Sequence, residues 1–384
     1  MFFLTVFSVW AVVHIYVGWR IASPVELSSK SRAMIWLIIV ISYMLLPVIT
    51  FLRLTHGVEP WYSLLFWITF IDGGFILTLV PILLFKDLLM LLIGLTKTII
   101  GFHPTDPSKR AFLARSINGA VLATTAIMTG KGFIQAQKAP TIKSIIIPVD
   151  DLHIDLDGLK FTQITDTHVS GSIGRDYIQG IVDLVNSTKP DLVFITGDVV
   201  DGLVHEKRME TAPLKHIESH HGTFLVTGNH EYYWDLHGWL EEFSSLGLDT
   251  LINSNRIIQR GGAKLMVAGV TDYSAERYAK NHKSDPAKAV NGAPQCDYKI
   301  MLAHQPKSVL AVHKTGVNLQ LSGHTHGGQF FPWTIVLPLL EPVCTGLSKY
   351  KDMVVYVSRG SGYWGPIHRL GSPSEITAFT LKRT

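Results

Sequence analysis

The pattern of apolar and polar positions changes near residue 130. Before this point, apolar residues form long runs; after it, they form short runs between polar turns. Residues 2–19, 34–52 and 62–85 are long and apolar enough for transmembrane helices, which need about 20 such residues. A fourth run, 116–130, is weaker and richer in small residues, so it is either a last span or a buried connecting helix. We therefore predict three to four spans over residues 1–130.

The third apolar run carries an acidic residue, Asp72, and resumes at 88–95 after Lys86 and Asp87. It either continues as one helix into the interface or is followed by a short surface helix. An ionisable group inside a span is costly and usually faces protein or water. We therefore expect Asp72 near one end of the span or paired with another helix, and a functional role stays open. Since only Asp72 and His14 could serve transport, we interpret the helices as an anchor.

Basic residues beside the apolar runs predict the orientation of the spans. The first loop contains Arg20, Lys30 and Arg32, and the loop after the third span is richer still. The positive-inside rule places both loops in the cytoplasm and the N-terminus outside. If residues 116–130 span, the second half of the chain lies outside; if they do not, it faces the cytoplasm. We expect a multi-pass protein of the cell membrane with its catalytic domain on the outer face.

The second half of the chain alternates strand and helix patterns. Residues 131–150 are predicted as a linker and first strand, and residues 151–384 as one globular domain. Its first part alternates predicted strands at 159–164, 191–196 and 223–226 with helices at 177–187 and 236–246. Further strands are predicted at 257–260, 264–268, 299–303, 317–321, 353–357 and 375–381. Alternating elements followed by mostly strands indicate two packed sheets flanked by helices.

Composition agrees with this division. Hydrophobic residues make up 47% of the chain and charged residues 17%, whereas about 25% is typical of globular proteins. The deficit of charge lies in the first half. The net charge is +4, and no basic stripe with interleaved aromatic residues is present, so no nucleic-acid partner is expected. The two cysteines, Cys296 and Cys344, form no CxxC pair and predict no disulfide framework.

Polar residues follow the apolar strands of the second half at the point where each strand ends. Asp166, Asp198, Asn229, His304 and His324 all occupy such positions. In open α/β sheets, ligands bind outside the carboxyl ends of the strands. These residues can therefore meet at one edge although they are spread over about 160 positions of the chain.

Two motifs among these residues suit a metal site. In Asp166-Thr167-His168, the acid and the imidazole lie two residues apart, which places them on one side of an extended chain. In 323–328 (Gly-His-Thr-His-Gly-Gly), two imidazoles have the same spacing and glycines allow a tight turn. A third motif, 228–231 (Gly-Asn-His-Glu), offers a neutral oxygen ligand beside a histidine.

The ordered set DxH, GD, GNHE, H and GHTH resembles the calcineurin-like metallophosphoesterase superfamily over roughly residues 157–381. Every position of the pattern is filled. Residues 357–360, 365–366 and 373–376, with Arg369, resemble the branch that contains membrane-anchored members. The resemblance implies a four-layer α-β-β-α sandwich and metal-dependent hydrolysis of phosphoric esters.

The resemblance also implies a role for each motif residue. The implied metal ligands are Asp166, His168, Asp198 and His326 for one ion, and Asp198, Asn229, His304 and His324 for the other. Such mixed nitrogen and oxygen ligands suit Mn²⁺, Fe or Zn²⁺ better than Mg²⁺ or Ca²⁺. Two such ions activate water and stabilise charge on the phosphoryl group. His230 would lie beside the scissile phosphate, stabilising the transition state or protonating the leaving oxygen.

Four further polar residues are open to more than one interpretation. Glu231 either orients an imidazole or is a surface acid. Asp272 contacts the substrate, supports His304 or is structural. Arg175 and Arg359 either bind a second phosphate or form surface ion pairs.

We expect a membrane-anchored phosphoesterase or pyrophosphatase with membrane lipid as a partner and a phosphate-containing, lipid-like substrate. The apolar stretch 330–343 is either a membrane-facing loop or lipid pocket, or the packed core of an insertion. Related proteins include pyrophosphatases that act on UDP-diacylglucosamine in lipid A synthesis; this alternative requires a cytoplasmic site. An alternative from another class is a non-catalytic membrane sensor or scaffold, which would be expected to have lost ligands.

Overall fold

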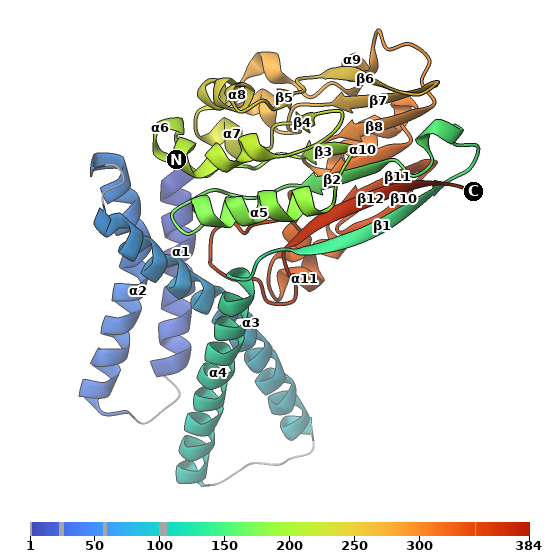
Figure 1. Ribbon diagram of the computed structural model, residues 1–384. Helices are drawn as coiled ribbons and strands as arrows, with labels where there is room; N and C mark the ends of the chain where they lie inside the picture. The colour runs from blue at the N-terminus through green and yellow to red at the C-terminus, as the bar shows by residue number, and fades with distance from the viewer. Residues whose placement is uncertain (1, 23–26, 57–59, 100–105, 342) are drawn as a thin grey trace. The chain divides into compact units, whose positions relative to one another are not determined.

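The computed structural model describes residues 2–22, 27–56, 60–99, 106–341 and 343–384 (Figure 1). The chain forms two compact units. The helical unit consists of Met1–Ile134 and Gly365–Leu370, and the sandwich unit consists of Gln135–Trp364 and Gly371–Thr384. A short segment from the C-terminal part of the chain therefore belongs with the N-terminal helices.

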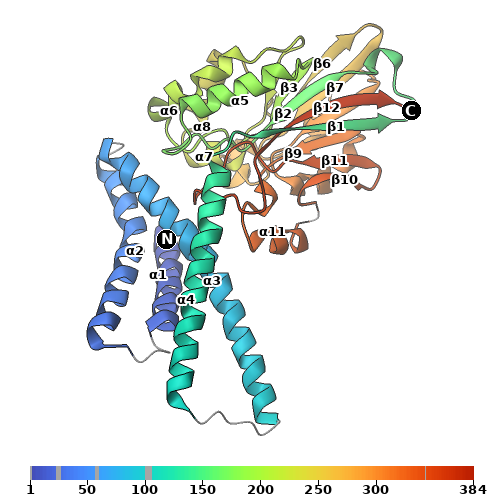
Figure 2. The ribbon, with the colours of Figure 1, turned by 60° about the horizontal axis from the view of Figure 1, so that its bottom comes forward.

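Four long helices make up most of the helical unit. They are α1 (Phe2–Ala22), α2 (Ser29–His56), α3 (Pro60–Ile99) and α4 (Pro107–Ala136). Each contains a stretch long and apolar enough to cross a membrane, judged by length and composition. The weakest predicted span, residues 116–130, lies inside the 26-residue stretch Ala111–Ala136 of α4. Helices α3 and α4 cross and then diverge (Figure 2).

Helix α3 runs through Lys86 and Asp87 without a break, so the apolar run 88–95 continues the third helix. Its 40 residues extend about 60 Å at a rise of 1.5 Å per residue, roughly twice the thickness of the hydrocarbon core. Pro81 lies inside the helix, where it removes one backbone hydrogen bond and favours a bend. Part of α3 must therefore lie outside the hydrocarbon layer.

The segment Gly365–Leu370 packs against α3 and α4 within the helical unit. His368 Nε2 lies 3.4 Å from Thr78 Oγ1, and the Arg369 amide donates to the Gly132 carbonyl at 3.0 Å. A Cβ atom on Gly132 would lie 2.1 Å from the His368 ring. Helix α4 therefore needs glycine at this position to admit the segment.

The sandwich unit contains two six-stranded sheets. The first has the order β1-β12-β2-β3-β4-β5, in which only the β12–β2 pair is antiparallel, and the second has the order β10-β11-β9-β8-β7-β6. The strands of the first sheet are β1 (Thr141–Val149), β2 (Lys160–Ile164), β3 (Leu192–Ile195), β4 (Thr223–Leu225), β5 (Asp249–Thr250) and β12 (Glu375–Arg383). Those of the second are β6 (Ser254–Arg260), β7 (Ala263–Gly269), β8 (Tyr298–Leu302), β9 (Leu319–Ser322), β10 (Gly346–Tyr350) and β11 (Met353–Val357).

Apolar side chains fill the space between the two sheets. Phe161 lies at the centre, with its ring 5.4 Å from that of Phe194 and 4.9 Å from that of Phe379. Leu302 and Leu321 enter the same buried cluster from the second sheet. Burial of one large apolar side chain contributes about 1.5–3 kcal/mol, so this cluster is the main source of stability for the sandwich.

Helices cover the outer faces of both sheets. On the first sheet they are α5 (Arg175–Ser187), α6 (Val204–Thr211), α7 (Asn229–Tyr233) and α8 (Leu236–Ser245) (Figure 1). On the second they are α9 (Pro286–Val290) and α10 (Val309–Val312), whose apolar residues pack with those of β7, β8 and β11. The predicted four-layer α-β-β-α sandwich is thus confirmed.

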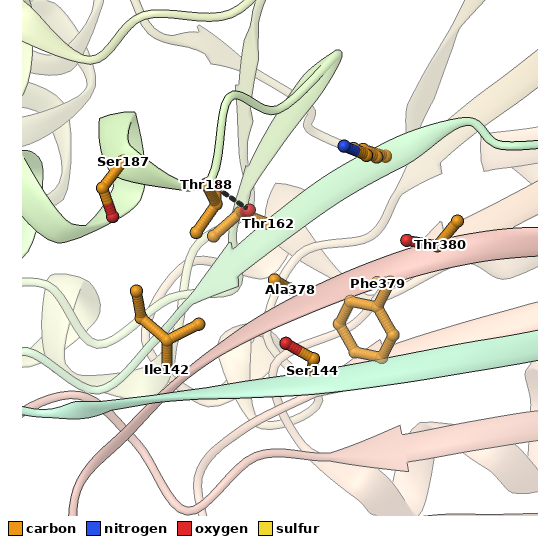
Figure 3. Close-up of a pocket in the computed structure, with 9 residues that line it drawn as sticks. Ile142, Ser144, Thr162, Ser187, Thr188, Ala378, Phe379 and Thr380 are labelled. Atoms are coloured by element: carbon orange, nitrogen blue, oxygen red, sulfur yellow. Dashed lines mark hydrogen bonds between the residues drawn. The ribbon is translucent and has the colours of Figure 1, made fainter.

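One hollow lies on the outer face of the first sheet. Its volume is about 350 Å³, and residues of β1, β12 and β2 line it together with the end of α5 (Figure 3). The hydroxyls of Thr162 and Thr188 lie 2.7 Å apart on one side. None of the predicted metal ligands lines this hollow, so the site described below lies elsewhere.

Candidate metal centre

Five strands deliver the predicted ligands to one place. Strands β2, β3 and β4 are parallel neighbours in the first sheet, and β8 and β9 are parallel neighbours in the second. Each runs within a few residues into Asp166, Asp198, Asn229, His304 or His324. Parallel strands end at the same edge, so these loops can meet at the carboxyl ends of both sheets.

The structure brings these side chains within ligand distance of one another. Three groups could hold a metal ion, each with its ligand atoms within 4.8 Å of one another: Asp166, His168 and His326; His168, Asp198 and His230; and Asp198, His304 and His324. His326 Nε2 lies 3.3 Å from Asp166 Oδ1, and His304 Nε2 lies 3.1 Å from Asp198 Oδ2. Asp198 belongs to two of the groups, which is the position that a bridging ligand needs.

The chemistry of these donors fits divalent cations. His168 Nε2 and His326 Nε2 lie 3.1 Å apart, and His304 Nε2 and His324 Nδ1 lie 3.2 Å apart. Two imidazole lone pairs facing each other repel unless a proton or cation lies between them. In addition, Asn229 Oδ1 is buried and has no hydrogen-bond partner among the described residues, although a buried polar atom normally has one.

The backbone at the site is strained. Five of the seven predicted ligands have left-handed φ angles: Asp166 (53°), His168 (47°), Asp198 (51°), His324 (69°) and His326 (50°). Such conformations cost about 1–3 kcal/mol each in residues other than glycine and gather at functional sites. Glycine is also required beside the ligands, because a Cβ atom on Gly228 would lie 2.1 Å from Asp198 Oδ1. The strained backbone conformations thus direct these side chains toward the site.

Electrostatics hold the buried acids in their charged form. Burial alone would raise the pKa of Asp198, but His304 and His230 outweigh burial and hold it well below its ordinary value. The pKa of Asp166 is also lowered, because His326 outweighs the effect of burial. Conversely, Asp198 raises the pKa of His304 against the effect of burial. The buried acids are therefore held as carboxylates, which is the form that binds metal cations.

Comparisons with known proteins agree with this geometry. Residues 159–328 match a family model described as calcineurin-like phosphoesterase. Over 226 residues the chain is 30% identical to an uncharacterized metallophosphoesterase of Aquifex aeolicus, a match that covers 58% of this chain and 85% of that protein. The chain belongs to the calcineurin-like phosphoesterase family.

Two other relatives of this family cover more of the chain. A transmembrane protein with metallophosphoesterase domain from Danio rerio is 36% identical over 287 residues, which is 72% of this chain and 65% of the relative. An uncharacterized metallophosphoesterase of Helicobacter pylori is 38% identical over 253 residues, 65% of this chain and 66% of the relative. The chain thus spans just under two thirds of the length of these two relatives. Together with the four candidate spans, the relative's name indicates a membrane protein.

Within this domain of the phosphoesterase family, Asp201 is a site residue that lies outside the sequence motifs. Its carboxylate hydrogen-bonds His230 Nδ1 and lies 3.3 Å from His168 Nδ1. Burial lowers the pKa of His230, but the carboxylates of Asp201 and Asp198 outweigh burial and raise it to about 9. The available signal was an acid three residues after Asp198 in the same loop. Asp201 therefore orients His230 and keeps it protonated.

Glu231 has neither of the two roles considered from the sequence. It is fully buried, and its carboxylate accepts hydrogen bonds from the amides of Gly228 (2.7 Å), Asp198 (3.1 Å) and Val199 (2.7 Å). Burial and the nearby Asp198 raise its pKa to about 7. Glu231 thus ties the loop of Asp198 to the loop of Asn229.

The remaining ambiguous residues divide into two kinds. Asp272 is buried and accepts from Ser274 and from Gln305, the neighbour of His304, so it supports the histidine loop. Arg175 donates to the Met209 carbonyl at the surface. Arg359 packs against Gly327, directly after His326, and its role in binding a second phosphate stays a prediction.

Two aromatic side chains lie beside His230. The ring of Trp364 lies 5.5 Å from the His230 ring, and that of Tyr233 lies 5.0 Å from it. Gln329 holds Trp364 by two hydrogen bonds, accepting from its amide at 3.0 Å and donating to its carbonyl at 2.8 Å. Trp364 is still 53% exposed. Its position leaves an apolar surface next to the candidate catalytic residue.

Proposed function

We propose that this protein is a membrane-anchored hydrolase of phosphate esters or pyrophosphates that depends on two divalent metal ions. The observation that carries the proposal is that Asp198 belongs to two of the three His/Asp groups that could hold a metal ion, one of which also contains His230. One ion would be held by Asp166, His168, Asp198 and His326. The second ion would be held by Asp198, Asn229, His304 and His324. When bound, such ions polarise the phosphoryl group and activate water.

His230 is proposed as the catalytic residue. Its Nδ1 is bonded to Asp201, and its Nε2 lies 3.9 Å from Asp198 Oδ2. With Nδ1–H directed to Asp201, the proton on Nε2 is the one available to the substrate. A raised pKa keeps that proton in place at neutral pH, so His230 can stabilise negative charge or protonate the leaving oxygen.

An amphiphilic substrate is the class that we propose. The segment after the ligand loop is exposed and apolar: Ile335 and Leu340 are well exposed, and Leu339 is 82% exposed. With the exposed Trp364 beside His230, these residues offer an apolar surface close in the chain to the metal loop. Large exposed apolar surfaces mark binding sites for proteins, lipids or ligands. A tether of membrane-spanning helices favours lipid.

The outer face of the membrane is the proposed location of the active site. A spanning α4 (Pro107–Ala136) gives four spans in total and, with the basic loops in the cytoplasm, an external sandwich unit. Reporter fusions at Lys131 and Thr384 test this placement. If both report cytoplasm, the external placement is wrong and the UDP-diacylglucosamine class becomes the favoured substrate.

A single assay tests the activity itself. The purified full chain with Mn²⁺ should hydrolyse a generic aryl phosphodiester, and a chelator should abolish the reaction. His230→Ala should lose activity, whereas His220→Ala, which removes an exposed histidine of the same unit, should keep it. Metal binding without hydrolysis of mono-, di- or pyrophosphate substrates would favour the sensor or scaffold alternative.

A further inference from the structure

Three polar side chains from three different helices form a hydrogen-bonded chain inside the helical unit. They are His14 on α1, Ser42 on α2 and Asp72 on α3. His14 Nε2 lies 3.0 Å from Ser42 Oγ, which lies 2.7 Å from Asp72 Oδ2. His14 and Ser42 are 2% and 7% exposed. Asp72 is thus paired with another helix, which is one of the two positions expected for it.

The bonding partners fix which protons this chain can hold. His14 Nδ1 lies 2.8 Å from the Trp10 carbonyl, which can only accept, so Nδ1 carries a proton. The Ser42 hydroxyl has a single proton to donate. Two arrangements satisfy every partner, and they differ in the direction of the two remaining hydrogen bonds.

In the first arrangement, Asp72 is ionised, Ser42 donates to it, and a positively charged His14 donates to Ser42. In the second, Asp72 carries the proton and donates to Ser42, and Ser42 donates to a neutral His14. The second arrangement becomes the first when the Asp72 proton moves to Ser42 Oγ and the Ser42 proton moves to His14 Nε2. The number of protons and the net charge of zero are the same in both.

Loss of the shared proton would leave one negative charge among apolar helices. An uncompensated charge in such surroundings is costly, and even a buried ion pair is offset by its desolvation. The neutral arrangement, with the proton on Asp72, is therefore the resting one. The chain holds this proton while offering it a short path to His14.

Among the described residues, the other acid of α3 lies apart from this chain, whereas a tyrosine of α2 contacts it. Asp87 is occupied by Arg20 and Tyr16, and it lies 15 residues further along α3, about 22 Å at 1.5 Å per residue. On α2, Tyr43 meets the His14 ring edge-on at 5.9 Å.

The segment Gly365–Leu370 contributes two further titratable groups to the helical unit. His368 packs at Gly74, about 200° further round α3 than Asp72 at 3.6 residues per turn. Arg369 follows it, and its backbone amide donates to the Gly132 carbonyl of α4. Among the described residues, the titratable partner that interacts with Asp72 is His14.

We propose that the helical unit is a proton-binding site, in which Asp72 stores one proton and Ser42 relays it to His14. The ligand is a proton delivered from water or a buffer acid. This role goes beyond anchoring and is independent of the hydrolytic activity of the sandwich unit.

Infrared difference spectroscopy on the full chain in phospholipid vesicles tests the proposal. At neutral pH, subtraction of the Asp72→Asn spectrum from the wild-type spectrum should leave a carboxylic-acid C=O band, because the band of Glu231 is common to both and cancels. Asp87→Asn, which removes an acid from the same helix, should leave the band unchanged. Absence of a band that distinguishes the wild type from Asp72→Asn would overturn the proposal, as would its loss in Asp87→Asn.

A second pair of variants tests the relay. Ser42→Ala removes the acceptor of the Asp72 proton, so the band should persist but move to the higher frequency of a free acid. Ser42→Thr keeps a hydroxyl and should restore the original frequency. An unshifted band in Ser42→Ala would overturn the relay. Retained Mn²⁺-dependent hydrolysis in each variant, or an unchanged thermal melt if the chain lacks that activity, shows that it is folded.

Discussion

The helical unit and the sandwich unit both bury ionisable side chains, but they do so by different means. In the sandwich unit, the predicted ligands lie in strand-end loops, and five of the seven have left-handed backbone angles. In the helical unit, His14, Ser42 and Asp72 lie within regular helices. Loops can form dense motifs that a sequence displays, whereas helices contribute single residues that meet only after packing.

Removal of Asp198, the proposed bridging acid of the sandwich unit, should have the largest effect on activity. Asp198→Ala deletes the one carboxylate that belongs to two of the candidate metal-binding groups. We expect Asp198→Ala to lose bound Mn²⁺ and to lower kcat/KM by more than about 100-fold. Mutation of a residue that only supports a metal ligand already lowers metal affinity or activity by about 10–100-fold. Elemental analysis and the phosphodiester assay measure both quantities. Asp183→Asn, on the exposed side of α5, is the control and should change neither.

Loss of His230 should separate catalysis from metal binding. His230→Ala should lower kcat by about 10²–10⁴-fold, the range for a general acid or base, while the metal content stays at the wild-type level. If the metal is lost as well, His230 acts as a ligand and the catalytic role assigned to it is wrong.

Substitution of Asp201 tests whether its buried carboxylate supports catalysis by raising the pKa of His230. Asp201 helps to raise the pKa of His230 to about 9, so Asp201→Asn lowers that pKa. His230 then loses its proton at a lower pH, and the alkaline limb of the kcat/KM profile should move to lower pH. We expect a loss of about 10–100-fold at neutral pH. Asp176→Asn, an exposed acid on α5, should leave the profile in place.

The smallest effect on activity is expected in the helical unit. Gly132→Ala places a methyl group against the His368 ring and should destabilise the protein by about 1–3 kcal/mol through overpacking. Gly130→Ala, on the same helix, meets no atom within 4 Å and should stabilise by up to about 1 kcal/mol. Thermal melts in detergent compare the two. Equal melting temperatures would mean that the segment Gly365–Leu370 does not pack on α4.

Much of the fold follows from local patterns. The predicted strand 159–164 is observed as β2 (Lys160–Ile164), and the predicted helix 177–187 as α5 (Arg175–Ser187). Both depend on short-range periodicity, which the sequence displays directly. The unbroken α3 was one of two alternatives, because the charges of Lys86 and Asp87 interrupt hydropathy without interrupting helical geometry.

The candidate site was only partly predictable. The seven motif residues could be named, but Asp201 could not, because its importance depends on where the His230 ring turns. Glu231 was ambiguous for the same reason: three amides from two loops define its role. Such roles depend on contacts between residues about 30 positions apart.

The sequence by itself determined the division into apolar helices and a two-sheet sandwich, and the set of residues that suits two metal ions. Hydrophobic periodicity and motif spacing are local properties, so they can be identified from the sequence alone. Only the tertiary structure decided that His14, Ser42 and Asp72 meet, and that Asp201 directs His230. Hydrogen bonds act over about 3 Å, and only packing brings residues that are distant in the chain within that range.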